Sequence, residues 1–196
     1  MDKKILILAS GNKAKMKEIK ELLPEFKIVG YKELGEDFEI EETGKTFYEN
    51  ALIKAKTIAE KYGLPTLSDD SGLCVKALGG APGVYSARYA GTGNDEDNNR
   101  LLLKNLEGVK DRAAKFVCCT VFYLPDGKIF TETGETEGEI LEKEEGENGF
   151  GYDPVFYSYD LKKSFGNACG EEKNAVSHRG RAMNKIAAII SENLKS

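Results

Sequence analysis

The chain has 196 residues, of which 40% are hydrophobic and 9% aromatic, so it is long and apolar enough to form a packed core. Its formal net charge of −5 argues against a protein that binds nucleic acid along a basic surface. The five-residue apolar run near the N-terminus is too short for a signal peptide or a membrane span. We therefore expect a cytoplasmic protein with no membrane partner and a single domain over residues 1–196.

The first half of the chain predicts strands that alternate with helices. Residues 3–9 form a continuous apolar strand, and a helix follows over residues 13–23. A second strand covers residues 26–30. The clearest helix runs over residues 46–62, where apolar side chains recur with the 3.6-residue period. The next strand, residues 64–69, is expected to end at two aspartates.

The second half of the chain predicts a helix, a hairpin, a short strand and a closing amphipathic helix, over residues 94–106, 113–135, 153–158 and 182–194. Asn94 or Asp95 caps the first of these elements, and the hairpin turns at Pro125-Asp126-Gly127. Strands that alternate with helices, followed by a long antiparallel pair, predict an α/β fold with a mixed central sheet covered by helices.

The stretch SGNKAK, residues 10–15, lies where the first strand turns into the first helix. The N–H groups and the dipole at a helix start favour a phosphate group there. Lys13 and Lys15 add positive charge, and Gly11 lets the backbone come close to a ligand. A capped surface helix with solvated lysines has the same pattern, so this motif alone leaves both interpretations open.

Two acidic stretches carry candidate metal ligands. LSDDSG, residues 67–72, is either a solvated turn or a metal or general-base site at the end of a strand. EDFEIEETG, residues 36–44, is either a solvated face or the source of a second carboxylate. In the second case Glu41 or Glu42 joins Asp70 in holding Mg²⁺.

Two later stretches carry groups suited to an aromatic, anionic ligand. GFGYDP, residues 149–154, contains Phe150 and Tyr152, which either stack on a nucleobase or cap the core. EEKNAVSHRGRA, residues 171–182, contains the single histidine, His178, in a basic stretch that disfavours its charged form. A phosphate loop, a carboxylate site, a stacking loop and a basic cluster together make the parts of a nucleoside triphosphate site.

The stretches SGNKAK, EETGKTFYENALIKA, DDSGLCVKALGGAPGVYSARYAG, GFGYDPVF and EEKNAVSHRGRA follow one another in this order. Together they resemble the inosine/xanthosine triphosphate pyrophosphatase family, over about residues 4–190. The resemblance implies a homodimer of α/β chains, each with two lobes and the active-site cleft between them. It also implies Mg²⁺-dependent hydrolysis of ITP, dITP and XTP to the monophosphate and pyrophosphate, which removes these non-standard nucleotides from the nucleotide pool.

The resemblance assigns roles position by position. Asp70 is the general base and, with Glu41, binds Mg²⁺. Ser71 contacts substrate, and Lys54 is a further phosphate-binding candidate. The other substrate-binding residues hold the phosphates (Ser10, Gly11, Asn12, Lys13, Ala14 and Lys15), shape the base pocket (Phe150, Gly151, Tyr152 and Asp153) or read the purine edge (Lys173, His178 and Arg179).

Two other functions fit the same sequence features. One is a related pyrophosphatase that acts on modified pyrimidine nucleotides, as in the septum-inhibitor family of similar fold. The other is a nucleotide-binding sensor without turnover. The presence of both Glu41 and Asp70 favours an enzyme, because binding alone requires no general base.

Overall fold

The computed structural model describes residues 3–35 and 39–194, which divide into two compact units. The first unit comprises the described parts of Met1–Asp70, Cys118–Gly134 and Arg181–Ser196, and the second comprises Ser71–Val117 and Glu135–Gly180. Three strands and the last helix contribute residues to both units, so the chain passes between the units inside regular secondary structure.

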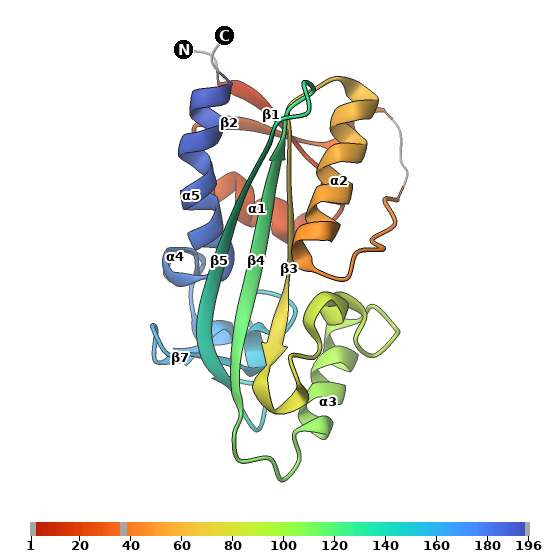
Figure 1. Ribbon diagram of the computed structural model, residues 1–196. Helices are drawn as coiled ribbons and strands as arrows, with labels where there is room; N and C mark the ends of the chain where they lie inside the picture. The colour runs from red at the N-terminus through yellow and green to blue at the C-terminus, as the bar shows by residue number, and fades with distance from the viewer. Residues whose placement is uncertain (1–2, 36–38, 195–196) are drawn as a thin grey trace. The chain divides into compact units, whose positions relative to one another are not determined.

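The strands of the described residues form one seven-stranded sheet in the order β2-β1-β3-β4-β5-β6-β7 (Figure 1). Their bounds are Lys4–Leu8 (β1), Phe26–Gly30 (β2), Thr66–Val75 (β3), Ala113–Tyr123 (β4), Ile129–Ile140 (β5), Phe156–Ser158 (β6) and Lys163–Ser164 (β7). β1 pairs in parallel with β2 and β3, whereas β6 pairs antiparallel with β5 and β7. The predicted mixed sheet of an α/β fold is therefore confirmed.

The helices are Lys13–Leu22 (α1), Phe47–Tyr62 (α2), Asp95–Asn105 (α3), Gly170–Val176 (α4) and His178–Asn193 (α5). Side chains cap α2 and α3, and the cap of α3 is one of the two predicted residues. The hydroxyl of Thr46 accepts a hydrogen bond from the N–H of Glu49 at the start of α2, and Asn94 accepts one from Asp97 at the start of α3. Gly63 ends α2 with a left-handed φ of 65°.

Several predicted boundaries are wrong: β5 continues to Ile140 instead of residue 135, and β6 begins at Phe156 instead of residue 153. β3 does not end at the aspartates but continues to Val75, because Leu73 and Val75 extend its buried side. α5 begins at His178 instead of Ala182. Its first turn contains Gly180, where a Cβ would overlap the carbonyl of Asn174 in α4, so the glycine allows the two helices to approach closely.

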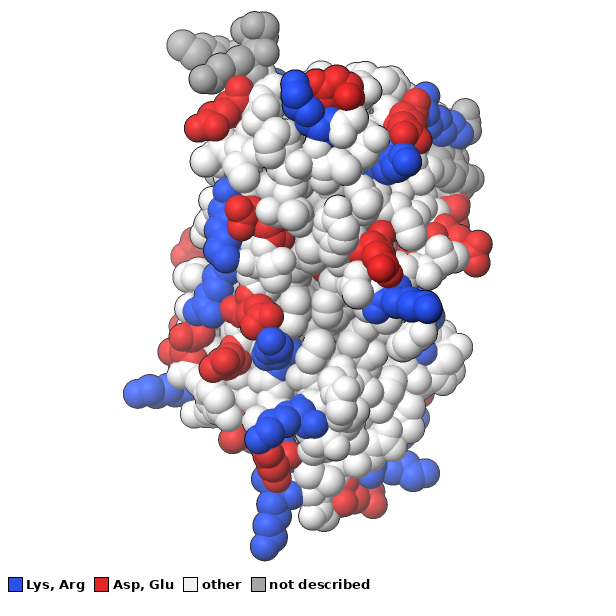
Figure 2. All heavy atoms as spheres, in the orientation of Figure 1, with Lys and Arg blue, Asp and Glu red and all other residues white. Residues whose placement is uncertain are grey.

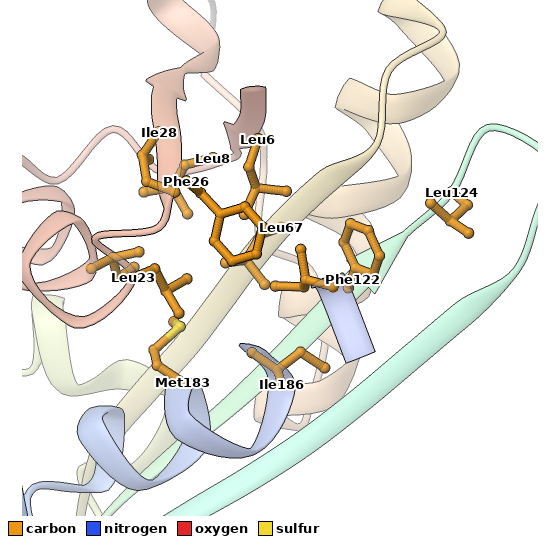
Figure 3. Packing of buried hydrophobic residues seen from close by; sticks show 12 residues of the cluster. Leu6, Leu8, Leu23, Phe26, Ile28, Leu67, Phe122, Leu124, Met183 and Ile186 are labelled. Atoms are coloured by element: carbon orange, nitrogen blue, oxygen red, sulfur yellow. The ribbon is translucent and has the colours of Figure 1, made fainter. Parts of the chain in front are cut away.

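Each unit has its own hydrophobic core. In the first unit, α5 lays Met183 and Ile186 against the inward side chains of the sheet, including Leu67 and Phe122 (Figure 3). In the second unit, a separate cluster gathers buried side chains from β3, α3 and its C-terminal end, β4, β6 and the turns before β6 and after β7, namely Leu73, Val75, Leu102, Leu106, Phe116, Val155, Phe156 and Phe165. Both cores position polar residues that lie on the same strands.

Basic and acidic side chains are interspersed over the face shown in Figure 2. An anionic ligand must therefore be attracted by particular cationic groups, because charges of opposite sign lie close together on that face. Within the described residues, none of the helices is both long and apolar enough to cross a membrane.

Candidate functional site

The turn from β1 into α1 places Lys15 beside Asp69. The N–H of Ala9 donates to the carbonyl of Leu67 over 2.8 Å, which fixes the end of β1 next to β3. Asn12 then caps α1, since its Oδ1 accepts from the N–H groups of Ala14 and Lys15 at 2.9 and 3.0 Å. One turn into the helix, Lys15 Nζ lies 3.3 Å from Asp69 Oδ2. A phosphate at this turn would meet the lysine side chains, because Asn12 already occupies two of the helix N–H groups.

The two aspartates of LSDDSG have different partners. Adjacent residues of a strand point to opposite faces, so Asp69 and Asp70 diverge. Asp69, which is 0% exposed, contacts Lys15 and accepts from the thiol of Cys118 at 3.8 Å. Asp70, which is 6% exposed, contacts residues of α2 instead. The solvated-turn interpretation of this stretch is wrong, because both carboxylates are buried inside β3.

Lys54 links Asp70 to the loop that precedes α2. Its Nζ lies 2.7 Å from Glu42 Oε1 and 3.6 Å from Asp70 Oδ1. Burial by itself lowers the pKa of Lys54, but Asp70, Asp69 and Glu42 outweigh burial and raise the pKa above its ordinary value. Lys54 is therefore a buried cation that stays charged at neutral pH.

The same surroundings raise the pKa of the Asp70 carboxyl. Burial is the largest cause, and the negative charges of Glu42 and Asp69 act in the same direction. Lys54 and Lys15 oppose this rise without cancelling it. A carboxylate with a raised pKa holds a transferred proton more readily than an ordinary aspartate, which suits a general base.

Asn50 is a member of this group that the sequence analysis did not identify. Its Nδ2 donates to Asp70 Oδ2 at 3.2 Å, and its Oδ1 accepts from the N–H of Gly44 at 2.8 Å. Asn50 precedes Lys54 by four residues, so both side chains lie on one face of α2. That i, i+4 spacing of two polar residues on an otherwise apolar helix face is the signal that could have revealed it.

The acidic loop provides two neighbouring carboxylates in different situations. Glu42 is engaged by Lys54, whereas the exposed Glu41 forms no ion pair with any residue that the structure describes. Glu36 and Asp37, which the sequence analysis included in the same acidic stretch, lie outside the described residues. Among residues 3–35 and 39–194, no three His, Cys, Asp or Glu side chains gather closely enough to hold a metal by themselves. Glu41 as a metal ligand stays a prediction.

In the second unit, the GFGYDP loop presents Phe150 next to two cations. Asp153 Oδ2 accepts from the N–H of Phe150 at 2.8 Å and from Lys173 Nζ at 2.6 Å. Lys173 Nζ lies 4.7 Å from the centre of the Phe150 ring, and the guanidinium carbon of Arg179 lies 5.8 Å from it. Four predicted residues of the base pocket and purine edge thus lie together.

Tyr152 of the same loop points into the core instead. Its hydroxyl donates to the carbonyl of Ser86 at 2.7 Å, and burial raises the pKa of this phenol well above its usual range. The core-capping interpretation is thus the correct one for Tyr152. Phe150, by contrast, is only partly buried.

The first turn of α5 carries the remaining predicted residues. The Nη2 of Arg179 donates to Ser71 Oγ at 2.8 Å, so Arg179 joins the residue that follows Asp70 in β3. His178 is buried and stacks on Phe116, with ring centres 4.7 Å apart and planes 11° from parallel. Both side chains are thereby held in fixed positions within the second unit.

The fold and these groups define an α/β protein with buried ion pairs around two aspartates in one unit and an aromatic loop beside two cations in the other. The sequence matches the Ham1 family over residues 6–189, and the chain belongs to this family. It is 48% identical to a dITP/XTP pyrophosphatase of Clostridium perfringens, with 98% of each chain covered. It is 46% identical to a dITP/XTP pyrophosphatase of Treponema denticola, covering 94% of this chain and 97% of that one.

A solved structure agrees with these relatives. The Staphylococcus aureus Ham1 protein is 42% identical and superposes with a TM-score of 0.88, over 97% of this chain and all of that one. The family resemblance drawn from five sequence stretches is therefore confirmed, as is the α/β fold. The expected cleft between two lobes stays a prediction.

Proposed function

We propose that this chain is a nucleoside triphosphate pyrophosphatase that hydrolyses non-standard purine nucleotides, namely dITP, ITP and XTP. The observation that carries the proposal is the environment of Asp70, a buried carboxylate with a raised pKa held between Lys54 and Asn50. Relatives named dITP/XTP pyrophosphatases support the substrate class. The reaction yields the nucleoside monophosphate and pyrophosphate.

The first unit would bind the triphosphate. Lys13 and Lys15 at the start of α1, together with Lys54 of α2, supply positive charge, while Ser10 and Gly11 provide a hydroxyl and an unhindered backbone. Two of these lysines, Lys15 and Lys54, are held by carboxylates and so are positioned before a ligand arrives. Catalysis of phosphoryl transfer depends mainly on such positioning and on charge stabilisation.

The residues fit a bound Mg²⁺. This ion favours one or two carboxylates with substrate phosphates and waters, and no cage of three protein ligands is needed. Asp70 and Glu41 would hold it, because Glu42 is occupied by Lys54. When bound, the ion supplies charge neutralisation for the phosphates and for the leaving pyrophosphate. A bound cation would oppose the burial and the neighbouring carboxylates that raise the pKa of Asp70.

The protein's own part in the reaction is proton transfer and orientation. Asp70, in its ionised form, takes a proton from a water molecule whose oxygen bonds to the α-phosphorus. The bond from that phosphorus to the bridging oxygen of the β-phosphate breaks, and pyrophosphate leaves with the electron pair. Asn50 keeps the carboxylate oriented by its hydrogen bond. Lys54 balances the charge that develops beside it.

The second unit would bind the base. Phe150 stacks on the purine, Lys173 and Arg179 lie beside its ring as donors, and His178, the residue before Arg179, is a further donor to the base. Inosine and xanthosine carry an oxygen acceptor at purine position 6, whereas adenine carries an amino donor. A buried donor that faces another donor is strongly disfavoured, so ATP should be rejected. A homodimer is part of the same proposal and rests on the family resemblance, and the cytoplasmic location stays a prediction.

A coupled phosphate assay tests this function. dITP and Mg²⁺ are supplied with and without added inorganic pyrophosphatase. The proposal predicts free phosphate only when the second enzyme is present, because the primary product is pyrophosphate. Phosphate without the second enzyme would indicate removal of the terminal phosphate instead. Binding of dITP without any product would indicate a sensor, and preference for modified pyrimidine nucleotides would indicate the related pyrophosphatase class.

A further inference from the structure

Helix α3 holds the aromatic loop of the second unit through the backbone of a single residue, Gly151. Asp95 Oδ2 accepts from the N–H of Gly151 at 2.8 Å, and Asn99 Nδ2 donates to the carbonyl of Gly151 at 3.1 Å. Asp95 and Asn99 are four residues apart and so share one face of the helix. Both hydrogen-bonding groups of Gly151 are thereby bound by side chains of the same helix.

The loop needs such external contacts to keep one conformation. Gly149 and Gly151, which flank Phe150, have φ values of 79° and 62°, a region that glycine adopts easily and other residues rarely. Glycine is also the residue with the largest backbone freedom to lose. The position of the Phe150 ring beside Lys173 therefore depends on what holds its two glycine neighbours.

Two adjacent asparagines of α3 have different hydrogen-bond partners, and Asn99, unlike Asn98, binds the aromatic loop. Asn98 uses both amide atoms, accepting from the N–H of Ala90 at 2.8 Å and donating to the carbonyl of Ala87 at 3.2 Å. Asn99 is 3% exposed, and its Oδ1 has no hydrogen-bond partner within the described part of the chain. A buried amide oxygen without a hydrogen bond costs stability. Asn99 nevertheless has this cost while its amide nitrogen binds Gly151.

We propose that Asp95 and Asn99 are positioning residues that fix the backbone on both sides of the Gly151 Cα and thereby set the Phe150 ring for the nucleobase. This inference rests on the proposed function, because the ring has a nucleobase to meet only if the substrate is a nucleotide. Neither side chain needs to touch the substrate. Their effect is on affinity for the base part of the ligand, and the chemistry at Asp70 is left unchanged.

Steady-state kinetics with dITP test the proposal. Asp95→Ala and Asn99→Ala should raise KM by roughly 3- to 10-fold, the effect of one net hydrogen bond, with kcat changed by less than about twofold. Asp95→Asn keeps an oxygen acceptor for the Gly151 N–H and should restore KM. The inhibition constant of pyrophosphate, which lacks a base, should stay the same in every variant.

Two neighbouring residues of α3 provide matched controls. Asp97→Ala removes the same charge from the same helix turn, where Asp97 pairs with Arg100 at 3.0 Å and does not hold the loop. Asn98→Ala removes an equally buried amide that binds residues 87–90 instead. Both should leave the KM for dITP within about twofold of the wild type.

Amide hydrogen exchange over residues 149–153 gives a readout that does not require turnover. Asp95→Ala and Asn99→Ala should lose protection there, whereas Asn98→Ala should lose it over residues 87–90. Unchanged exchange over 149–153, an unchanged KM, or an equal KM increase in Asp97→Ala would overturn the proposal. A wild type that does not hydrolyse dITP would refute the proposed function and the nucleobase role together. The exchange result would still decide whether the loop is held.

Discussion

Asn50 donates its side-chain amide to Asp70 Oδ2 at 3.2 Å and at the same time accepts the N–H of Gly44 at 2.8 Å. One fully buried side chain thus connects the carboxylate of β3 with the loop that carries Glu41 and Glu42. Because Lys54 also reaches both Glu42 and Asp70, the loop is joined to β3 by two separate contacts. The position of the acidic loop is therefore set by α2.

Gly44→Ala should disrupt this connection. A Cβ at Gly44 would lie 2.6 Å from Cβ of Glu49, 2.7 Å from Oδ1 of Asn50 and 2.8 Å from the backbone nitrogen of Asn50, so the loop has to move. We expect kcat/KM for dITP to fall at least about tenfold and the Mg²⁺ concentration for half-maximal activity to rise. The displaced Asn50 would weaken its hydrogen bond to the charged Asp70, and such a bond contributes about 1.5–3 kcal/mol.

Lys45→Ala is the matched control for this prediction, because Lys45 is the next residue and its side chain is exposed. Mg²⁺ titrations of activity on both variants provide the comparison. If Gly44→Ala and Lys45→Ala had the same metal dependence as the wild type, the loop would have no part in metal binding.

Gly11→Ala should separate ligand binding from folding. In the protein without ligand, a Cβ at Gly11 would meet only Lys32 Cε at 3.4 Å and Tyr31 Oη at 3.9 Å, which are ordinary contacts. The melting temperature should therefore stay within about 2 °C of the wild type. If phosphates approach this backbone closely, KM for dITP should rise several-fold. An unchanged KM would remove Gly11 from the phosphate site.

Asp70→Asn should abolish most activity while making the metal-free protein more stable. Loss of a general base lowers turnover by roughly 10²- to 10⁴-fold. The folded-state pKa of Asp70 lies above its ordinary value of 3.8, mainly because of burial. A raised pKa contributes stability below the ordinary value, and this stability is lost as the pH rises through the folded-state pKa. At pH 7.5 the ionised carboxylate therefore opposes folding.

Thermal melts in a chelating buffer from pH 7.5 down to pH 4 show whether ionisation of Asp70 lowers the stability of the folded protein. Asp70→Asn should melt above the wild type at pH 7.5, and the difference should shrink as the pH falls. A variant that melts below the wild type at pH 7.5 would contradict the inference that the ionised Asp70 carboxylate opposes folding.

Asp69→Asn should cost less activity than Asp70→Asn, because Asp69 acts through Lys15 and does not take the proton. The variant should raise KM for dITP while keeping most of kcat. A double-mutant cycle of Asp69→Asn with Lys15→Met should show a coupling energy of roughly 0.5–3 kcal/mol, as expected for residues in contact. Additive effects, or a kcat loss larger than that of Asp70→Asn, would exchange the roles of the two aspartates.

The sequence predicted most of the first-half elements because their signals are local. The 3.6-residue period of α2 and its caps at Thr46 and Gly63 depend on residues that lie close together in the sequence. The continuation of β3 past Asp70 was missed because Asp, Ser and Gly favour turns, and only tertiary burial keeps them in a strand. Gly180 similarly concealed the first turn of α5.

Some residues of the candidate site could likewise be predicted from the sequence, and others could not. Chemically distinctive residues such as Lys54, Asp70 and Arg179 could be selected from the sequence, because the motifs that contain them are specific. Their partners could not be selected so easily. Asn50 and Asn99 are ordinary asparagines in helices, and their roles depend on which distant backbone or side-chain atom they meet. The i, i+4 spacing of Asn50 and Lys54 marks a polar pair on α2, but the atom that each asparagine meets is determined by the fold.

The most direct test of the account is the ratio of kcat/KM for dITP to that for dATP, measured with Mg²⁺ and detection of pyrophosphate. The two nucleotides share the sugar and the triphosphate, so only groups that contact the base can distinguish them, and these are the groups proposed in the second unit. The account predicts a ratio that reaches roughly 10²–10⁴, with ITP and dITP within about one decade of each other. Comparable kcat/KM values for dITP and dATP would contradict it.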